Sequence, residues 1–281
     1  MADNFFLFLI KNIIENTKIN KIDLFSENSV IFSGVTQAFT NIYLEKKPTK
    51  IYDIEFIEKN LKKQISIDLI KKLDENFSLI AYDQKDVEIL TKLSNFPKLK
   101  SLQFVKNQRG ELDLTIFKSF ITSTHTDLKL IKGNDIQKYK LKEILNPNYV
   151  CSDFLEKSKK SSFIKNKRIA CPQISNQKSE IRIKFSLIEE GNVLGNSCNF
   201  ISVEENLLGY DIYYFLALFN TNIINWFFKK FNSNNHIGNY EIASFPVHED
   251  KLLIEKISSL CKTYLNTMNS KVLDDINRLV L

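Results

Sequence analysis

The longest apolar stretch of the chain, and the one that decides how its C-terminal half folds, is Tyr210-Asp211-Ile212-Tyr213-Tyr214-Phe215-Leu216-Ala217-Leu218-Phe219-Asn220-Thr221-Asn222-Ile223-Ile224-Asn225-Trp226-Phe227-Phe228-Lys229-Lys230-Phe231. Its length approaches the roughly 20 residues that a membrane-spanning helix needs. The adjacent polar residues Asn220, Thr221 and Asn222 argue against a span, because polar side chains are costly in lipid. Thr221 can instead cap a second helix, after a first one that ends near Phe219. The stretch therefore predicts a pair of buried helices.

Short strands and turns are expected on both sides of this helix pair. β-Branched and aromatic residues gather there in short runs bounded by turn residues, which is the pattern of strands. The runs are Leu128–Ile131, Arg168–Ile174, Ile181–Leu187, Asn199–Val203 and Glu241–Phe245, the last of them stopped by Pro246. Beyond them, apolar residues at helical spacing over Leu252–Leu279 predict one or two closing helices.

The N-terminal region has a different pattern. An amphipathic stretch, Phe5–Thr17, precedes two strand-like runs, Lys21–Phe25 and Asn41–Leu44, which flank Val30–Val35. This order of helix and strands predicts an edge of an α/β sheet. From Lys46 the sequence becomes lysine-rich with helical periodicity, which predicts a helical connector.

These patterns together predict an α+β fold in four parts. They are an edge of an α/β sheet at residues 1–50, a helical connector at 51–109, a mixed strand and helix domain at 110–250, and a C-terminal helix at 251–281.

Composition excludes several classes of protein. Only 7 of 281 residues are glycine, and no two of them form a G-x-G arrangement, so a dinucleotide fold and a P-loop are not supported. The 4 cysteines form no C-x-x-C pair, so we expect neither a bound metal nor a disulfide framework. The apolar run Phe5–Ile10 is too short for a signal peptide, and we expect a cytoplasmic protein without a membrane span. The net charge of +6 permits a polyanionic partner.

No catalytic residue emerges from the sequence. His125, His236 and His248 lie in polar or loop contexts, and none of them is one helical turn from a carboxylate or cysteine in the sequence. Asn146-Pro147-Asn148-Tyr149 can be compared with the N-P-P-Y motif of amino-group methyltransferases. Asn148 replaces the second proline, and we interpret the tetrapeptide as an ordinary turn.

Binding has more support than catalysis. Residues 168–184 combine basic side chains with amides and hydroxyls, and Lys229 and Lys230 end the helix pair beside an Asn-rich loop. Gln and Asn can pair with adenine, while Arg and Lys reach guanine or phosphate. The alternative is the ordinary polar surface of a protein rich in Asn and Lys.

Five segments, in order, resemble the TaqI-like C-terminal specificity domain, the target-recognition domain of adenine-specific N6 DNA methyltransferases and of restriction enzymes fused to them. Together they cover about half of the chain and are Gly110–Thr115, Lys132–Tyr139, Ile169–Ser175, the helix pair Phe215–Asn220 to Trp226–Phe231, and Glu241–Pro246. The resemblance implies recognition of double-stranded DNA in a restriction-modification system.

The first fifty residues resemble the last strands of such an enzyme's catalytic domain. The segments are Lys21–Phe25, Val30–Phe32 and Gly34–Phe39, ending in Ile42–Lys46. In the family, the cofactor loop and the N-P-P-Y motif precede this region. The resemblance therefore implies that S-adenosylmethionine and the chemistry belong to a catalytic methyltransferase half, and that this half or a restriction subunit is the partner.

The resemblance and the basic segments together give a set of candidate DNA-binding residues. Expected phosphate contacts are Lys132, Asn134, Lys138, Arg168, Lys178, Lys229 and Lys230. Expected base contacts are Gln173, Ser175, Asn176, Arg182, Asn234 and Asn235. Two alternatives remain open: a protein-interaction subunit that completes a catalytic partner without contacting DNA, and a complete methyltransferase that binds its own cofactor.

Overall fold

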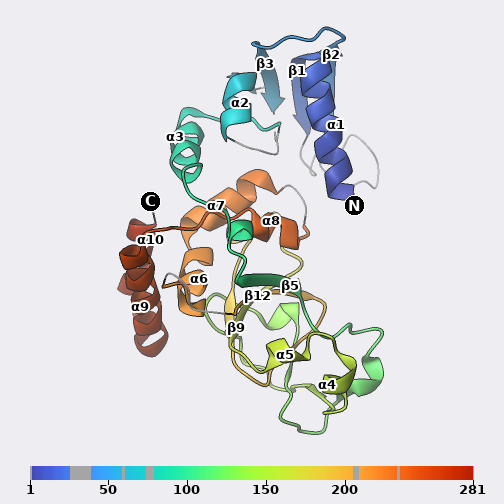
Figure 1. Ribbon diagram of the computed structural model, residues 1–281, viewed down its shortest axis with the longest axis vertical. Coiled ribbons are helices and arrows are strands. Elements are labelled where there is room, and N and C mark those ends of the chain that lie inside the picture. Colours follow the sequence, from blue (N-terminus) through green and yellow to red (C-terminus); the bar gives the residue numbers. More distant parts are fainter. Residues whose placement is uncertain are drawn as a thin grey trace. The chain divides into compact units, whose positions relative to one another are not determined.

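The computed structural model describes residues 2–25, 39–58, 61–73, 79–204, 209–232 and 235–280. Helices and strands are mixed without regular alternation, which confirms the expected α+β class (Figure 1). The chain divides into two compact units, Met1–Asn95 and Phe96–Leu281. Among the residues described, no helix is long and apolar enough to cross a membrane.

The first unit is built on a four-stranded sheet with the order β2-β1-β3-β4. β1 pairs antiparallel with β2 and parallel with β3, and β3 forms an antiparallel hairpin with β4. Buried Ile22, Ile54 and Phe56 form part of its core. The elements are α1 (Ala2–Asn16), β1 (Lys18–Phe25), β2 (Phe39–Glu45), β3 (Asp53–Glu58), β4 (Leu61–Ser66), α2 (Ile67–Leu73) and α3 (Gln84–Leu93).

The helical connector expected at residues 51–109 needs correction. β3 and β4 lie within it and belong to the sheet, because Ile54 and Phe56 alternate with exposed or half-buried residues at the period of a strand. Helices α2 and α3 do follow, and Asp83 caps α3 by accepting from Asp86 N at 2.8 Å. β1 and β2 confirm the two expected N-terminal strands, whereas the run Val30–Val35 lies outside the described residues.

The second unit contains a four-stranded antiparallel sheet with the order β10-β9-β12-β5. Its strands are β5 (Val105–Arg109), β9 (Arg168–Pro172), β10 (Ser186–Ile188) and β12 (Cys198–Val203). Two small sheets accompany it, pairing β7 (Leu130–Ile131) with β11 (Val193–Leu194) and β6 (Ile121–Thr122) with β8 (Tyr149–Val150). Short helices complete this part: η1 (Leu99–Ser101), η2 (Lys118–Phe120), η3 (Gly133–Asp135), α4 (Phe154–Lys157) and α5 (Ser161–Ile164).

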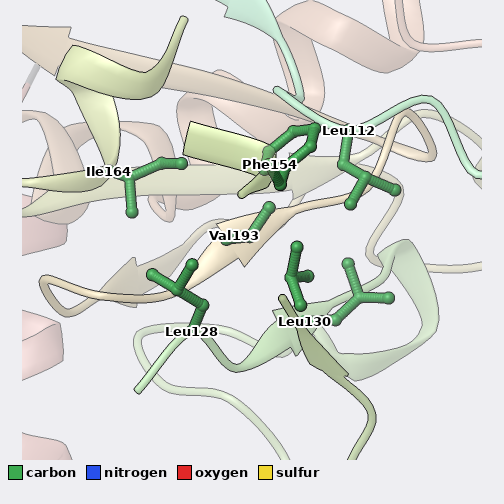
Figure 2. Packing of buried hydrophobic residues seen from close by; sticks show 7 residues of the cluster. Leu112, Leu128, Leu130, Phe154, Ile164 and Val193 are labelled. Atoms are coloured by element: carbon green, nitrogen blue, oxygen red, sulfur yellow. The ribbon is translucent and has the colours of Figure 1, made fainter. Parts of the chain in front are cut away.

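An apolar cluster holds the small sheets and short helices together. Figure 2 shows side chains from separate segments converging in this cluster. Its fully buried members include Leu112, Phe154 and Val193. Close by in sequence, Gly110 passes Gly195 so tightly that a Cβ at Gly110 would lie 2.1 Å from Gly195 O. Only a glycine fits at this crossing, so the end of β5 is fixed in place.

The predicted helix pair is confirmed as α6 (Ile212–Phe219) and α7 (Asn222–Phe231). Thr221 caps α7, its hydroxyl oxygen accepting from Ile224 N at 3.4 Å. α6 is almost entirely buried and packs against α9 (Lys251–Thr267), which α10 (Ser270–Leu279) follows (Figure 1). The closing helices are therefore also confirmed.

Two strand predictions need correction. Glu241–Phe245 was expected to be a strand, but α8 (Asn239–Ala243) forms there because the Glu241 carboxylate accepts from Gly238 N at 3.0 Å and caps a helical turn. Of the run Ile181–Leu187, only Ser186 and Leu187 enter β10. Asparagine side chains occupy the backbone donors of the preceding residues, as Asn225 Oδ1 does with Arg182 N at 2.8 Å.

Candidate nucleic-acid interface

Hydrogen bonds connect three loops at one end of the central strands β9 and β12. Gly133 N donates to Ser197 Oγ at 3.0 Å, Gln173 N donates to Ser197 O at 2.8 Å, and Ile237 N donates to Gln173 O at 2.7 Å. A Cβ at Gly133 would lie 2.6 Å from Ser197 O, so the η3 loop packs too closely there for any larger residue. These contacts bring the regions of Lys132, Gln173 and Asn235 together, although they are far apart in sequence.

The segment after β9 lies on α7. Asn225 on that helix accepts from Arg182 N at 2.8 Å and donates to Glu180 O at 2.9 Å. Ser175 N donates to Asn235 O at 2.8 Å, which ties the same segment to the loop after α7. The fold therefore holds residues 173–183 in a defined conformation against the helix pair.

Arg182 and Ser175 hold this segment from inside. Arg182 is 4% exposed; its guanidinium donates to Asn232 O at 2.5 Å and to Ser175 Oγ at 3.3 Å, and it lies 5.0 Å from the centre of the Phe228 ring. Ser175 is 9% exposed. Arg182 and Ser175 are thus engaged inside the fold, and their base contacts stay a prediction.

Arg168 is also an interior residue. It is fully buried, forms an ion pair with the equally buried Glu111 at 3.1 Å, and donates to Phe163 O at 2.5 Å and Asn192 O at 2.7 Å. Burial raises the pKa of the Glu111 carboxyl and lowers the pKa of the Arg168 guanidinium, and each partner's charge opposes the other's shift. Arg168 is therefore engaged inside the fold, and its phosphate contact stays a prediction.

Lys138 contacts the turn between the two helices of the pair. Its Nζ donates to Asn220 O at 2.8 Å, and burial lowers the pKa of its ammonium group. Asn220 in turn bonds Phe185 N and O through its side-chain amide, at 2.9 Å each. The half-buried Lys138 is thus engaged with the fold, and its phosphate contact stays a prediction.

The remaining candidates are accessible. Asn134, Asn176, Lys178, Lys229 and Asn235 are exposed, while Lys132, Gln173 and Lys230 are half-buried. We call these eight residues the loop surface. Asn234 lies outside the described residues. Beside the loop surface, Glu180, Ile181, Trp226, Lys229 and Lys230 line a groove of about 500 Å³ together with Asn222 and Asn225. Side-chain amides and lysines that lie next to an indole ring can contact both phosphates and bases.

Two residues next to this surface, Arg109 and Asn196, were missed from the sequence. Arg109, the last residue of β5, is exposed, and its Nε donates to Asn196 O at 2.9 Å. The terminal atoms of the Gln173 amide lie 3.0 Å from Arg109 Nε and 2.9 Å from Asn196 O. The polar strand Lys106-Asn107-Gln108-Arg109 before Gly110 was the available signal, but it fell inside the expected connector.

The histidines show no catalytic arrangement among the described residues. His248 is buried, its Nδ1 lies 2.9 Å from the Tyr214 hydroxyl, and burial lowers its pKa. His125 and His236 are exposed. In the part of the chain that the structure describes, no group of three or more His, Cys, Asp or Glu residues could hold a metal ion.

The fold and the site define a class of protein: a mixed α+β domain that presents a loop surface of amides and lysines. Residues 128–247 match the family model of the TaqI-like C-terminal specificity domain. This match confirms the resemblance for that part of the chain. No curated protein matches the chain.

One solved structure supports the fold. The chain is similar to the type IIL restriction-modification enzyme MmeI, solved in complex with DNA, with a TM-score of 0.54 and 11% identity over 99% of this chain and 44% of that one. A second alignment, to the type IIG restriction endonuclease BpuSI, has a TM-score of 0.40 and 9% identity over the same shares of the two chains. The present chain thus spans less than half the length of the structures it matches.

Proposed function

We propose that this chain recognises a double-stranded DNA sequence as the target-recognition part of a restriction-modification enzyme. The loop surface carries the proposal, because hydrogen bonds hold separate loops together around an antiparallel sheet. The specificity-domain family and the DNA complex of MmeI support it.

The finer proposal concerns the chemistry that recognition serves. The resemblance of the first fifty residues to the last strands of a methyltransferase supports an adenine-specific N6 DNA methyltransferase. In this proposal S-adenosylmethionine binds in a catalytic partner half, and the present chain contributes no catalytic residue. Turning an adenine out of the stack costs a few kcal/mol, so the recognition surface must hold the duplex meanwhile. Such a system acts on the cell's own DNA, in the cytoplasm.

The salt dependence of duplex binding tests the proposal. If the lysines of the loop surface neutralise phosphates, the affinity of the full chain falls steeply between roughly 50 and 200 mM salt. Replacing Lys178 or Lys229 by Ala lowers the slope of log affinity against log salt by about one for each contact removed. Lys256→Ala, an exposed lysine of α9, is the matched control and leaves the slope unchanged. Binding that does not respond to salt contradicts the proposal.

A second function is favoured by the first unit. β2 ends the sheet order, and its Tyr43 and Leu44 side chains are 48% and 46% exposed. An apolar edge strand is a template for pairing with another chain, which supports a subunit that completes a catalytic partner. This candidate predicts self-association of the isolated chain, measured by sedimentation. A monodisperse monomer over a wide concentration range contradicts it.

A further inference from the structure

Arg109 stands on an unusually fixed piece of backbone. It is the last residue of β5 and pairs with Asn199 of β12, and Gly110 N donates to Cys198 O at 2.9 Å. The tight crossing of Gly110 and Gly195 follows immediately. The backbone position of Arg109 is therefore fixed. A residue that distinguishes one base from the other three needs such a fixed position.

The Arg109 guanidinium is oriented by a second layer of contacts. Its Nε donates to Asn196 O at 2.9 Å, and Asn196 is held by its own bonds: its N donates to Leu112 O and its Nδ2 to Asp113 Oδ2, both at 2.7 Å. Gln173 Nε2 donates to Asn199 Oδ1 at 3.1 Å, and with its amide turned over Gln173 Oε1 would instead accept from Arg109 Nε at 3.0 Å. Nε is thus occupied on the protein side.

Arg109 as a whole is an exposed residue. Among the described residues, Arg109 forms no ion pair within 4.0 Å of an acid, and Nε is its one side-chain donor with a partner. The neighbouring Lys160 binds the backbone instead, because its Nζ donates to Arg109 O at 2.7 Å. An arginine held at Nε presents two parallel N–H groups, the arrangement that matches O6 and N7 of guanine in the major groove.

We propose that Arg109 reads a guanine in the DNA target, and that Asn196 and Gln173 position it. The inference rests on the proposed function and deepens it, since it names one base of the recognised sequence and the residue that selects it. It also gives Gln173 a positioning role beside Arg109.

Selection of duplexes from a randomised library by the full chain tests the inference. The wild-type chain enriches a site that contains a required guanine, and Arg109→Ala loses the preference at that one position, by roughly 5- to 150-fold for a bidentate contact. Arg109→Gln moves the preference at that position toward adenine, because a side-chain amide pairs with adenine N6 and N7. Arg109→Lys keeps a weakened preference for guanine, since a lysine cannot form the two-pronged contact.

Lys178→Ala is the matched control. As the loss of a phosphate contact, it lowers affinity for every sequence alike and leaves the selected site unchanged. If Arg109→Ala behaves like this control, or leaves the selected site and the affinity unchanged, the inference is overturned while the proposed function stands. If the wild-type chain itself enriches no sequence, the proposed function fails and this inference fails with it. Circular dichroism of each variant verifies that the fold is intact.

Discussion

Glu111 and Arg168 form an ion pair of 3.1 Å in which neither side chain is exposed to solvent. The pair joins β9 to the segment after the Gly110 crossing, and Glu111 Oε2 also accepts from Leu194 N at 2.7 Å. Removing water from two charges is costly, and each buried charge is compensated only by its partner.

Removing one partner is therefore expected to be severe. Arg168→Ala leaves the Glu111 carboxylate buried without its counter-charge and lowers the free energy of unfolding by about 3–5 kcal/mol. Urea unfolding measures this loss. Lys167→Ala, which breaks the exposed pair with Glu189, is the control and costs less than about 1 kcal/mol. Equal stabilities of the two variants would contradict a structural role for Arg168.

A pH-dependent loss of stability is expected from His248. Burial lowers its pKa in the folded state below the ordinary value of about 6.5. Between the folded and unfolded pKa values the unfolded chain binds the additional proton, so stability is complete above about pH 6.5 and falls as the pH decreases toward the folded pKa. The free energy of unfolding, followed from pH 8 to pH 5 (roughly the range in which histidine titrates), measures this.

His248→Gln is the matched variant, because it removes the titrating ring and keeps a polar side chain. We expect its free energy of unfolding to decline less below pH 6.5 (about the ordinary histidine value) than that of the wild type. His125→Gln alters an exposed ring and should retain the wild-type profile. A wild-type profile that His248→Gln does not change would show that another group is responsible.

The sequence predicts elements well where the signal is local. The helix pair followed from apolar content and from Thr221, whose hydroxyl does cap α7. β3 and β4 were missed because their period-two pattern is short and lies among lysines that also suit a helix face. The α8 region carried a strand-like composition, but the local bond between Gly238 and Glu241 determined the outcome.

The sequence indicates which residue types can bind DNA, but it does not indicate which of those residues are exposed. Arg168, Arg182 and Lys178 look alike in sequence, as cations among polar residues, yet the two arginines are buried and Lys178 is exposed. The difference comes from tertiary neighbours, Glu111 for Arg168 and the Asn232 carbonyl for Arg182. No local pattern encodes such partners.

The contact between Gly133 and Ser197 is expected to be necessary for DNA binding. Gly133→Ala places a Cβ 2.6 Å from Ser197 O and displaces the η3 loop that carries Lys132 and Asn134. Overpacking of this kind costs about 1–3 kcal/mol. We expect weaker binding of the selected duplex together with a lower unfolding midpoint.

Ser197→Ala tests the same contact by changing the acceptor residue. It removes the oxygen that accepts from Gly133 N and leaves that donor without its partner, at a cost of about 1–3 kcal/mol. Both variants should weaken duplex binding in fluorescence anisotropy. Unchanged affinity in both variants would show that the η3 loop is not part of the DNA interface.

Asn225 is expected to hold the segment after β9 against α7. Its side chain accepts from Arg182 N and Ile183 N, at 2.8 and 3.3 Å, and donates to Glu180 O. Asn225→Ala leaves these backbone groups without partners in a partly buried position, and the segment should open locally before the rest of the unit unfolds. Hydrogen exchange should then be faster at residues 178–184 while β9 and β12 keep their protection.

Asn222→Ala on the same helix is the control for this prediction. Asn222 is exposed, and the contact that it makes to Asn277 uses its backbone N, which the substitution retains. Its exchange pattern should therefore match that of the wild type. Because Lys178 and Asn176 lie on the segment that Asn225 fixes, Asn225→Ala should also weaken duplex binding although it changes no residue of the loop surface. Faster exchange with unchanged DNA affinity would show that DNA recognition does not depend on the ordered conformation of this segment.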